Sequence, residues 1–255
     1  MTTAASGTEV TRADVCAVAC AEAWRGEGEI LASPMGNIPT IGARLARSSF
    51  SPDLLISDGE AFLLGDVPAL GQVGVVEGWL PYRLVFDVVA SGRRHVMMGA
   101  SQIDAYGNTN ISCIGDHAKP KAQLLGVRGG PGNTVNHRTS YWIPKHSPRV
   151  FVEHVDMVSG IGYDRAAQAG SSATKFHGLG RVITDLAVLD FGGSEHRMRL
   201  VSTHPGVSVD DVVAATGFAL AVPAEVPSTR VPTADELYIL STLDPRGLRT
   251  KEVAG

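Results

Sequence analysis

A short glycine-rich loop carries the residues best suited to hold negative charge. It runs from Arg128 through Gly129, Gly130 and Gly132 to Asn133. Glycine allows positive φ and lets backbone N–H groups approach a ligand, so such a loop can hold a phosphate, a carboxylate or a developing oxyanion. The permanently charged guanidinium of Arg128 offers a planar fork that matches a carboxylate or a phosphate. An ordinary tight strand-to-helix turn is the alternative interpretation of these glycines.

A second polar stretch, residues 102–110, precedes this loop and contains side-chain amides, among them Asn108. Each of the two stretches follows an apolar run, His95–Ala100 in the first case and Ala122–Val127 in the second. Both runs predict buried strands. Because ligands bind at the carboxyl ends of strands in an open α/β sheet, the sequence predicts a ligand site at these two loops.

Several further segments share a pattern with one known family. They are Ser101–Asn110, Arg149–Glu153, Val182–Val188, His204–Val207, Ala215–Phe218 and Pro232–Leu237, in addition to the glycine loop. Together they resemble the β subunit of class I coenzyme A transferases. The resemblance covers nearly the whole chain beyond residue 10, and the combination is far more specific than any single motif.

The resemblance implies a fold and a partner. The expected fold is the three-layer α/β fold of that superfamily, a mostly parallel open sheet flanked by helices with some antiparallel strands. Class I enzymes pair an α and a β subunit around one active site, so this chain is expected to need an α subunit. We expect an α2β2 heterotetramer, with a single αβ pair as the alternative. The cofactor expectation is none, with coenzyme A entering only as part of the acyl-CoA substrate.

One segment departs from the family pattern. Class I transferases carry a glutamate whose carboxylate attacks the acyl-CoA thioester, and alignment on Gly59 puts Ser57 in its place and Asp58 next to it. Glu60 lies beyond the glycine, and each step along an extended chain turns a side chain to the opposite face. A displacement of about 1 Å can cost catalysis roughly a hundredfold. We therefore expect no normal glutamyl-CoA intermediate, and we interpret Ser57, Asp58 and Glu60 either as turn residues or as supporting substrate-binding residues.

The leading hypothesis drawn from the resemblance is a hydrolase. In this interpretation the chain is the β subunit of a CoA-transferase-like enzyme that opens a ring in a cyclic β-keto acyl-CoA from steroid degradation. Such a reaction needs a general base for water and a place for negative charge on the ketone and thioester oxygens. The base is expected from the α subunit, since the family's glutamate is missing here. Arg128 is the expected catalytic residue of this chain, with Gly129, Gly130, Gly132, Asn133 and Asn108 binding substrate or coenzyme A.

Two alternatives remain open on the sequence alone. The first is an ordinary transferase that moves CoA between two carboxylic acids, with Glu60 as the nucleophile. The second is a non-catalytic scaffold subunit that completes the fold of its partner and tolerates changes throughout residues 128–133.

Composition narrows the class of protein. The net charge of -4 and pI of about 6.0 give no electrostatic case for binding nucleic acid or an anionic membrane. No apolar run is long enough to span a bilayer, and residues 1–7 lack the apolar core of a signal peptide. The three cysteines have neither metal-ligand spacing nor an even count for disulfides, which favours a reduced, cytoplasmic protein without a metal site.

The elements that position these residues are expected to form one domain over residues 1–255, with flexible ends at 1–8 and 248–255. Thr11, Ser208 and Thr233 are predicted N-caps of three helices. The segment 134–140, which follows the Arg128 loop, is interpreted as a short helix whose N-terminus points at the same ligand.

Two further interpretations concern the middle of the chain. Residues 160–180 show no apolar periodicity and are interpreted as an exposed or interface loop without a nucleotide-binding motif. His137, next to the glycine loop, is interpreted as a hydrogen-bonded structural histidine rather than a catalytic base.

Overall fold

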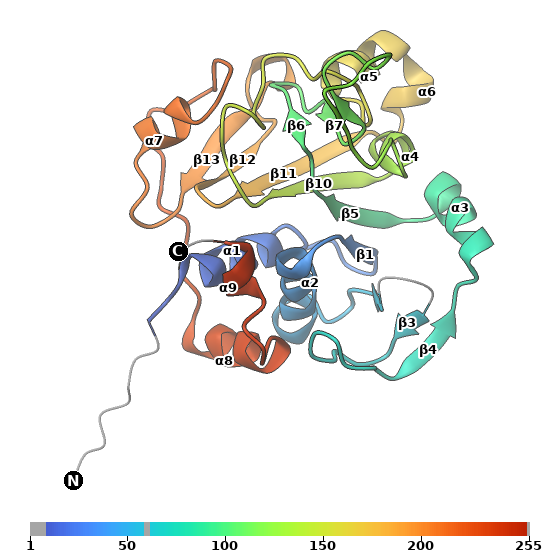
Figure 1. Ribbon diagram of the computed structural model, residues 1–255. Coiled ribbons are helices and arrows are strands. Elements are labelled where there is room, and N and C mark those ends of the chain that lie inside the picture. Colours follow the sequence, from blue (N-terminus) through green and yellow to red (C-terminus); the bar gives the residue numbers. More distant parts are fainter. Residues whose placement is uncertain (1–8, 59–61, 254–255) are drawn as a thin grey trace.

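A six-stranded sheet forms the centre of the molecule in the computed structural model, which describes residues 9–58 and 62–253 (Figure 1). The strand order is β1-β5-β10-β11-β12-β13, in which β1, β5, β10 and β11 are parallel and the last two strands antiparallel. The strands are β1 Leu31–Pro34, β5 Arg94–Met98, β10 Arg138–Ile143, β11 Gly178–Thr184, β12 Ala187–Asp190 and β13 Arg199–Thr203. The predicted, mostly parallel sheet with late antiparallel strands is confirmed.

Helices cover both faces of this sheet (Figure 1). On one face lie α1 Arg12–Glu22, α2 Asn37–Ser49, α8 Ala234–Leu243 and α9 Arg249–Glu252. On the other lie α4 Gly130–Asn136, α5 Tyr163–Ala169 and α6 Ser171–Thr174, while α3 Tyr82–Ser91 and α7 Val209–Ala214 lie toward opposite ends of the sheet. This three-layer arrangement is the fold expected from the family resemblance.

Alternating strand residues divide the interior into two apolar clusters. Met97, Trp142 and Ile183 pack with α1 and α2, whereas Tyr141 and Val182 pack on the opposite face. Successive strand side chains point to opposite faces, and both faces here are covered by other elements. The parallel strands are therefore buried on both sides, although polar residues such as Arg94, Thr139 and Ser140 interrupt their apolar pattern.

The predicted N-caps are confirmed by the structure. The hydroxyls of Thr11, Ser208 and Thr233 each accept a hydrogen bond from the backbone three residues on, and reciprocal side-chain bonds complete three capping boxes. Local chemistry alone sets these helix starts, which is why they are readable from sequence.

The two ends of the chain were expected to be flexible. Residues 249–252 instead form α9, and the Arg249 guanidinium bonds to the carboxylates of Asp14 and Asp244 at 2.7 and 3.0 Å. The Glu252 carboxylate accepts a hydrogen bond from Trp142 Nε1 at 2.7 Å. These long-range contacts attach the segment to the body. The expected flexible residues 1–8 and 254–255 lie outside the described residues.

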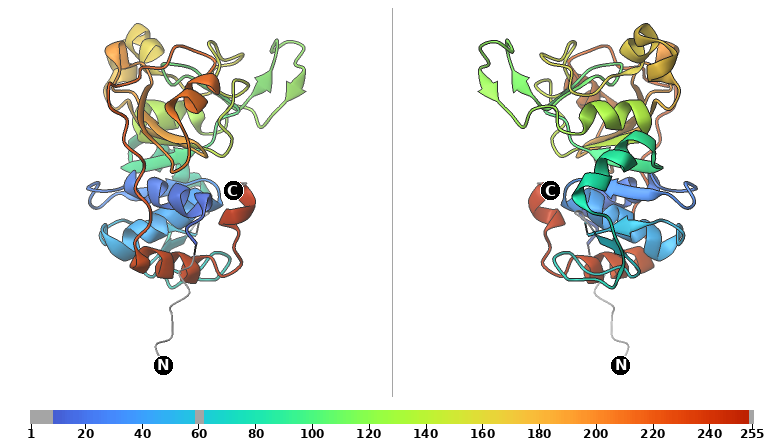
Figure 2. Two further views of the ribbon diagram at one scale, coloured as in Figure 1. Left: turned by 90° about the vertical axis from the view of Figure 1, so that its left-hand side faces the viewer. Right: turned by 90° about the vertical axis from the view of Figure 1, so that its right-hand side faces the viewer.

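Three small antiparallel sheets complete the fold. They are β2 Ile56–Ser57 with β3 Phe62–Leu64 and β4 Val76–Trp79, β6 Gln102–Ile103 with β7 Thr109–Asn110, and β8 Cys113–Ile114 with β9 Ala122–Gln123. The β8–β9 hairpin stands out from the body of the molecule (Figure 2). The prediction of a buried strand over Ala122–Val127 is wrong, because only two residues are in β9 and Leu125 is 68% exposed.

Three further predictions were wrong in this region. Residues 160–180 hold α5, α6 and the start of β11 rather than one loop, and each short helix buries a single alanine, too little for visible periodicity. The helix predicted over 134–140 begins earlier, at Gly130, because Pro131 suits a first helical turn, and residue 138 already starts β10. The sequence of residues 150–155 also predicts a strand, but the structure has only a bridge at Phe151 there.

No helix among the described residues is long and apolar enough to cross a membrane.

Candidate active site

A cavity of about 270 Å³ lies along β1 and contains the segment where the sequence departs from the family pattern. Its walls come from β1, β2, β3, α2, α3 and the start of β5, so six elements that are distant in sequence meet there. Most of the lining side chains are apolar. The polar exceptions are Ser33, Thr40, Ser57, Asp58 and Arg94.

Ser57 and Asp58 both line this cavity at the end of β2. The backbone N–H of Asp58 donates to the Phe62 carbonyl at 3.0 Å, and the N–H of Phe62 donates to Asp58 Oδ1 at 3.1 Å. These two bonds close the β2–β3 hairpin, so Asp58 has a turn-forming role in addition to its place in the cavity wall. Glu60, the third predicted residue of this segment, lies outside the described residues.

Arg94 is the cationic side chain of the cavity, and sequence reasoning missed it. Its Nη2 donates to Asn133 Oδ1, and its Nη1 lies 3.5 Å from Ser33 Oγ. Its Nε is buried without a hydrogen-bond partner, and no ion pair of Arg94 is found in the described part of the chain. Burial lowers the pKa of this guanidinium from its ordinary value.

A signal for Arg94 was present in the sequence. Arg93 and Arg94 directly precede the apolar run that begins at His95, and a permanently charged residue at the start of a buried strand needs a polar partner. The sequence could not show which partner that is, because Ser33 and Asn133 are distant in the chain.

Asn133 connects the predicted glycine loop to the cavity. This buried side chain lies in α4, accepts the bond from Arg94 and places its Nδ2 3.9 Å from Met98 Sδ. Of the predicted residues, Asn133 therefore joins Ser57 and Asp58 around Arg94, although it acts through that arginine rather than by lining the cavity.

Close packing explains two of the glycines of the loop. A Cβ on Gly130 would lie 2.8 Å from the Ser159 carbonyl oxygen, and one on Gly132 would lie 2.6 Å from Val89 Cγ1. The N–H of Gly130 donates to the Val127 carbonyl at 3.0 Å, so one predicted anion-binding amide is used in a turn. Gly129, by contrast, has only ordinary contacts at its Cβ position and is exposed.

Arg128 lies on the surface with a left-handed backbone. Its φ is 49°, a conformation that non-glycine residues rarely adopt and that often marks functional positions. The side chain is exposed, and in the described part of the chain it has no hydrogen bond or ion pair. The structure does not place it in the 270 Å³ cavity.

Asn108 is separate from this group. Its Nδ2 donates to Asp104 Oδ2 at 2.9 Å and to Asp164 Oδ1 at 2.8 Å, and its Oδ1 accepts from the N–H of Gly162 at 2.7 Å. Because these bonds use both amide donors and the acceptor, the side chain joins loops of the chain to one another. The structure does not bring it to the cavity with Ser57.

His137 is buried next to Arg94, with 2% of its surface exposed. Within the described residues neither ring nitrogen has a hydrogen-bond partner, contrary to the sequence interpretation. Burial and the charge of Arg94 lower its pKa to about 4, and the nearby Val89 carbonyl opposes this shift only in part. The imidazole is therefore neutral at pH 7.

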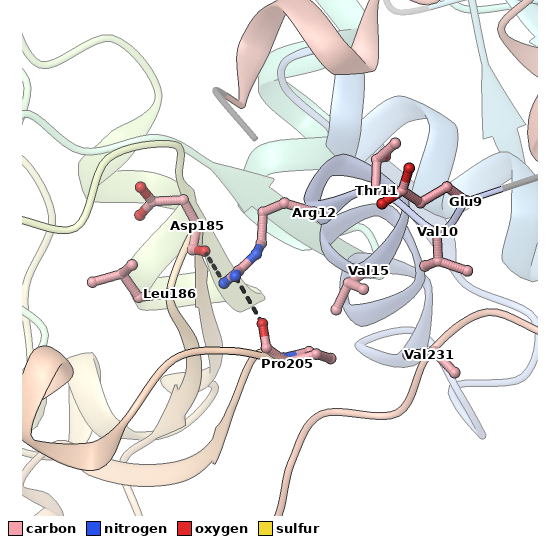
Figure 3. Close-up of a pocket in the computed structure, with 9 residues that line it drawn as sticks. All are labelled: Glu9, Val10, Thr11, Arg12, Val15, Asp185, Leu186, Pro205 and Val231. Carbon is pink, nitrogen blue, oxygen red and sulfur yellow. Dashed lines mark hydrogen bonds between the residues drawn. The ribbon is translucent and has the colours of Figure 1, made fainter.

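A larger cavity, of about 520 Å³, lies elsewhere, between the start of α1 and the β11–β12 turn (Figure 3). Arg12 is its central charge. Its Nη1 donates to the Asp185 carbonyl at 3.0 Å and its Nη2 to the Pro205 carbonyl at 2.8 Å, while the Asp185 carboxylate points away (Figure 3). No predicted site residue lines this cavity, and its arginine is held by the main chain.

In the described part of the chain, no group of three or more His, Cys, Asp or Glu side chains is arranged to hold a metal ion. The three cysteines are buried and unpaired. Burial raises the thiol pKa of Cys16 and of Cys20, so neither is a reactive thiolate.

Comparison with known proteins identifies the class of protein to which this fold belongs. A family model described as coenzyme A transferase matches residues 83–215, and the chain belongs to this family, as its sequence segments indicated.

Particular relatives carry one name. Over 248 residues the chain is 55% identical to the cholesterol ring-cleaving hydrolase IpdB subunit of Rhodococcus jostii (strain RHA1), covering 97% of this chain and 98% of that protein. It is 53% identical over 247 residues to the subunit of that name from Mycobacterium tuberculosis (strain ATCC 25618 / H37Rv), covering 95% and 98%. A chain in the crystal structure of Rhodococcus jostii RHA1 IpdAB matches with a TM-score of 0.94 at 54% identity, and the match covers 97% of this chain and 100% of that chain.

Proposed function

We propose that this chain is the β subunit of a heteromeric hydrolase that opens a ring in a cyclic β-keto acyl-CoA derived from steroid breakdown. The observation that carries the proposal is the 55% identity, over 97% of the chain, to a subunit named a cholesterol ring-cleaving hydrolase. The place of Ser57 supports it. A serine lines the cavity at the end of β2, where alignment on Gly59 would put the nucleophilic glutamate of class I transferases.

The proposed reaction has a balanced course. A base removes a proton from water, and the resulting hydroxide adds to the carbon of the ring ketone. The bond between this ketone carbon and the carbon α to the thioester then breaks. The ketone carbon becomes a carboxylate, and the bonding electron pair passes to the α carbon as an enolate, which then takes up a proton. A serine cannot supply the base for water at neutral pH without an activating neighbour. The base therefore comes from the α subunit in this proposal.

This chain would supply the electrostatic part of the site. Negative charge develops on the ketone oxygen and then on the thioester oxygen, and preorganised donors at such oxygens are often the largest single contribution to catalysis. Arg128 is suited to this role, because its guanidinium is exposed and has no partner within the described residues. Its left-handed backbone and its position just before α4 support the interpretation that the fold sets the direction of the Arg128 side chain.

The exposed guanidinium of Arg128, which has no hydrogen bond or ion pair within the described residues, supports a second subunit at this loop. We propose an α subunit as the partner, in an α2β2 heterotetramer, with acyl-CoA as substrate and no separate cofactor. The buried free cysteines support a reducing, cytoplasmic location.

The experiment is the substitution Arg128→Ala in the co-expressed complex. We expect turnover of the acyl-CoA to fall at least about a hundredfold, because loss of one oxyanion donor typically costs that much. Size-exclusion chromatography should show unchanged assembly. Arg246→Ala, which removes an exposed loop arginine far along the chain, is the matched control. Near-normal turnover in Arg128→Ala would remove this residue from the mechanism.

A further inference from the structure

The guanidinium of Arg94 lacks a charge partner within the described residues. Its two described hydrogen bonds go to the neutral groups of Asn133 and Ser33, and its Nε has none. Arg249, by contrast, contacts the carboxylates of Asp14 and Asp244. Burying a cation without a counterion is costly, and a fold retains such a group when something else supplies the negative charge.

The shape of the surrounding cavity indicates what that charge belongs to. About 270 Å³ is too small for a whole acyl-CoA but suits a ring-sized acyl group. Apolar side chains form most of the wall, so the occupant should be largely hydrocarbon. They include Leu31, Pro34, Met35, Phe62, Leu80 and Val85.

The other charged group at this cavity does not remove the case for an anion. Asp58 also lines the wall, but its Oδ1 accepts the Phe62 N–H that closes the β2–β3 hairpin. Asn133 of α4 holds Nη2 of Arg94, and the contact of Nη1 with Ser33 Oγ is long at 3.5 Å, which leaves Nη1 for a ligand. A planar guanidinium held in this way matches the two oxygens of a carboxylate.

We propose that Arg94 binds a carboxylate carried by the ring portion of the substrate, with Asn133 holding the guanidinium in place. The inference deepens the proposed function and rests on this cavity being the acyl site. It divides the work between two arginines. Arg94 binds the acid group and selects carboxylate-bearing substrates, and Arg128 is left to stabilise the oxygens at the reacting carbons.

A binding experiment tests this without requiring turnover. The assembled heteromer is titrated with cyclohexanecarboxylate and with the uncharged cyclohexanecarboxamide, by ligand-observed NMR. The wild type should prefer the acid, Arg94→Gln should lose that preference, and Arg94→Lys should keep part of it. Arg12→Gln, which changes an arginine bound to main-chain carbonyls, should behave as the wild type. Equal binding of acid and amide by the wild type, or an unchanged preference in Arg94→Gln, would overturn the proposal.

A kinetic experiment adds the link to the reaction. With a carboxylate-bearing cyclic β-keto acyl-CoA, Arg94→Gln should lower kcat/KM at least about 30-fold, as expected when one member of a buried charge pair is removed. With the methyl ester of that substrate the loss should stay below about threefold, because no charge pair forms. Equal losses on acid and ester would mean that Arg94 only supports the fold. Acid binding through Arg94 in a complex that hydrolyses neither compound would instead refute the proposed function alone.

Discussion

The 520 Å³ and 270 Å³ cavities are both lined by an arginine, and the larger of the two is not the better candidate site. In the 520 Å³ cavity, both terminal nitrogens of Arg12 donate to main-chain carbonyls. In the 270 Å³ cavity, the partners of Arg94 among the described residues are neutral, and its buried Nε has none there. The comparison teaches that unsatisfied charge, rather than volume, distinguishes a binding site from a gap between packed elements.

The residues around Arg12 form a hydrogen-bonded structural network. The N–H of His146 donates to Asp185 Oδ1 at 2.7 Å, and its ring nitrogens hydrogen-bond with Thr184 and Thr216 at 3.2 and 3.0 Å. His204 Nε2 lies 2.8 Å from the Thr184 carbonyl. These buried, satisfied groups attach the β11–β12 turn to its neighbours, so changes here should affect stability.

Acid should destabilise the fold in part through the two buried histidines of the Arg12 region. Burial lowers the pKa of both His146 and His204 to about 4, against about 6.5 in the unfolded chain. As pH falls from 6.5 toward 4 the unfolded chain takes up protons that the folded chain refuses, so stability falls with pH. Each such histidine should cost about 1.4 kcal/mol per pH unit within this window. Denaturant unfolding between pH 6.5 and 5 measures the slope, above the range where most carboxylates titrate.

The variant His146→Gln shows how much of the pH dependence of the unfolding free energy comes from His146. It should remove about 1.4 kcal/mol per pH unit, the share of one histidine, even if the variant is less stable at pH 7. A slope identical to that of the wild type would show that His146 is already protonated in the folded protein, contrary to its environment here.

The substitution Arg12→Gln should have a smaller effect on stability and almost none on catalysis. Losing two charge-assisted hydrogen bonds to carbonyls, one of them exposed, should lower the free energy of unfolding by about 1–2 kcal/mol. Thermal or denaturant unfolding gives this value, and kcat/KM of the complex should change less than about twofold. If Arg12→Gln abolished activity while Arg94→Gln did not, the roles of the two cavities would have to be exchanged.

The sequence revealed those features that depend on neighbours in the chain. Thr11, Ser208 and Thr233 identified helix starts because a capping box is complete within four residues. The apolar run of β5 identified a buried strand. The equally apolar run at 122–127 misled, because whether such a run is buried depends on what covers it, and here it ends a projecting hairpin (Figure 2).

The candidate site was only partly readable for the same reason. Ser57 and Asp58 were found because they break a family pattern, and the structure places both in the cavity wall. Asn108 was predicted with them, but its amide bonds to Asp104 and Asp164 elsewhere. Arg94 was missed because only the three-dimensional arrangement shows that its guanidinium contacts no carboxylate among the described residues.

The central claim is that the complex containing this chain breaks a carbon–carbon bond with water. The most direct measurement incubates the co-expressed pair with a cyclic β-keto acyl-CoA in H₂¹⁸O, without any acceptor acid, and analyses the product by mass spectrometry. We expect a ring-opened product that keeps its CoA thioester and carries ¹⁸O in the new carboxylate. Product that forms only when an acceptor acid is added, with CoA moved to that acid, would contradict the claim.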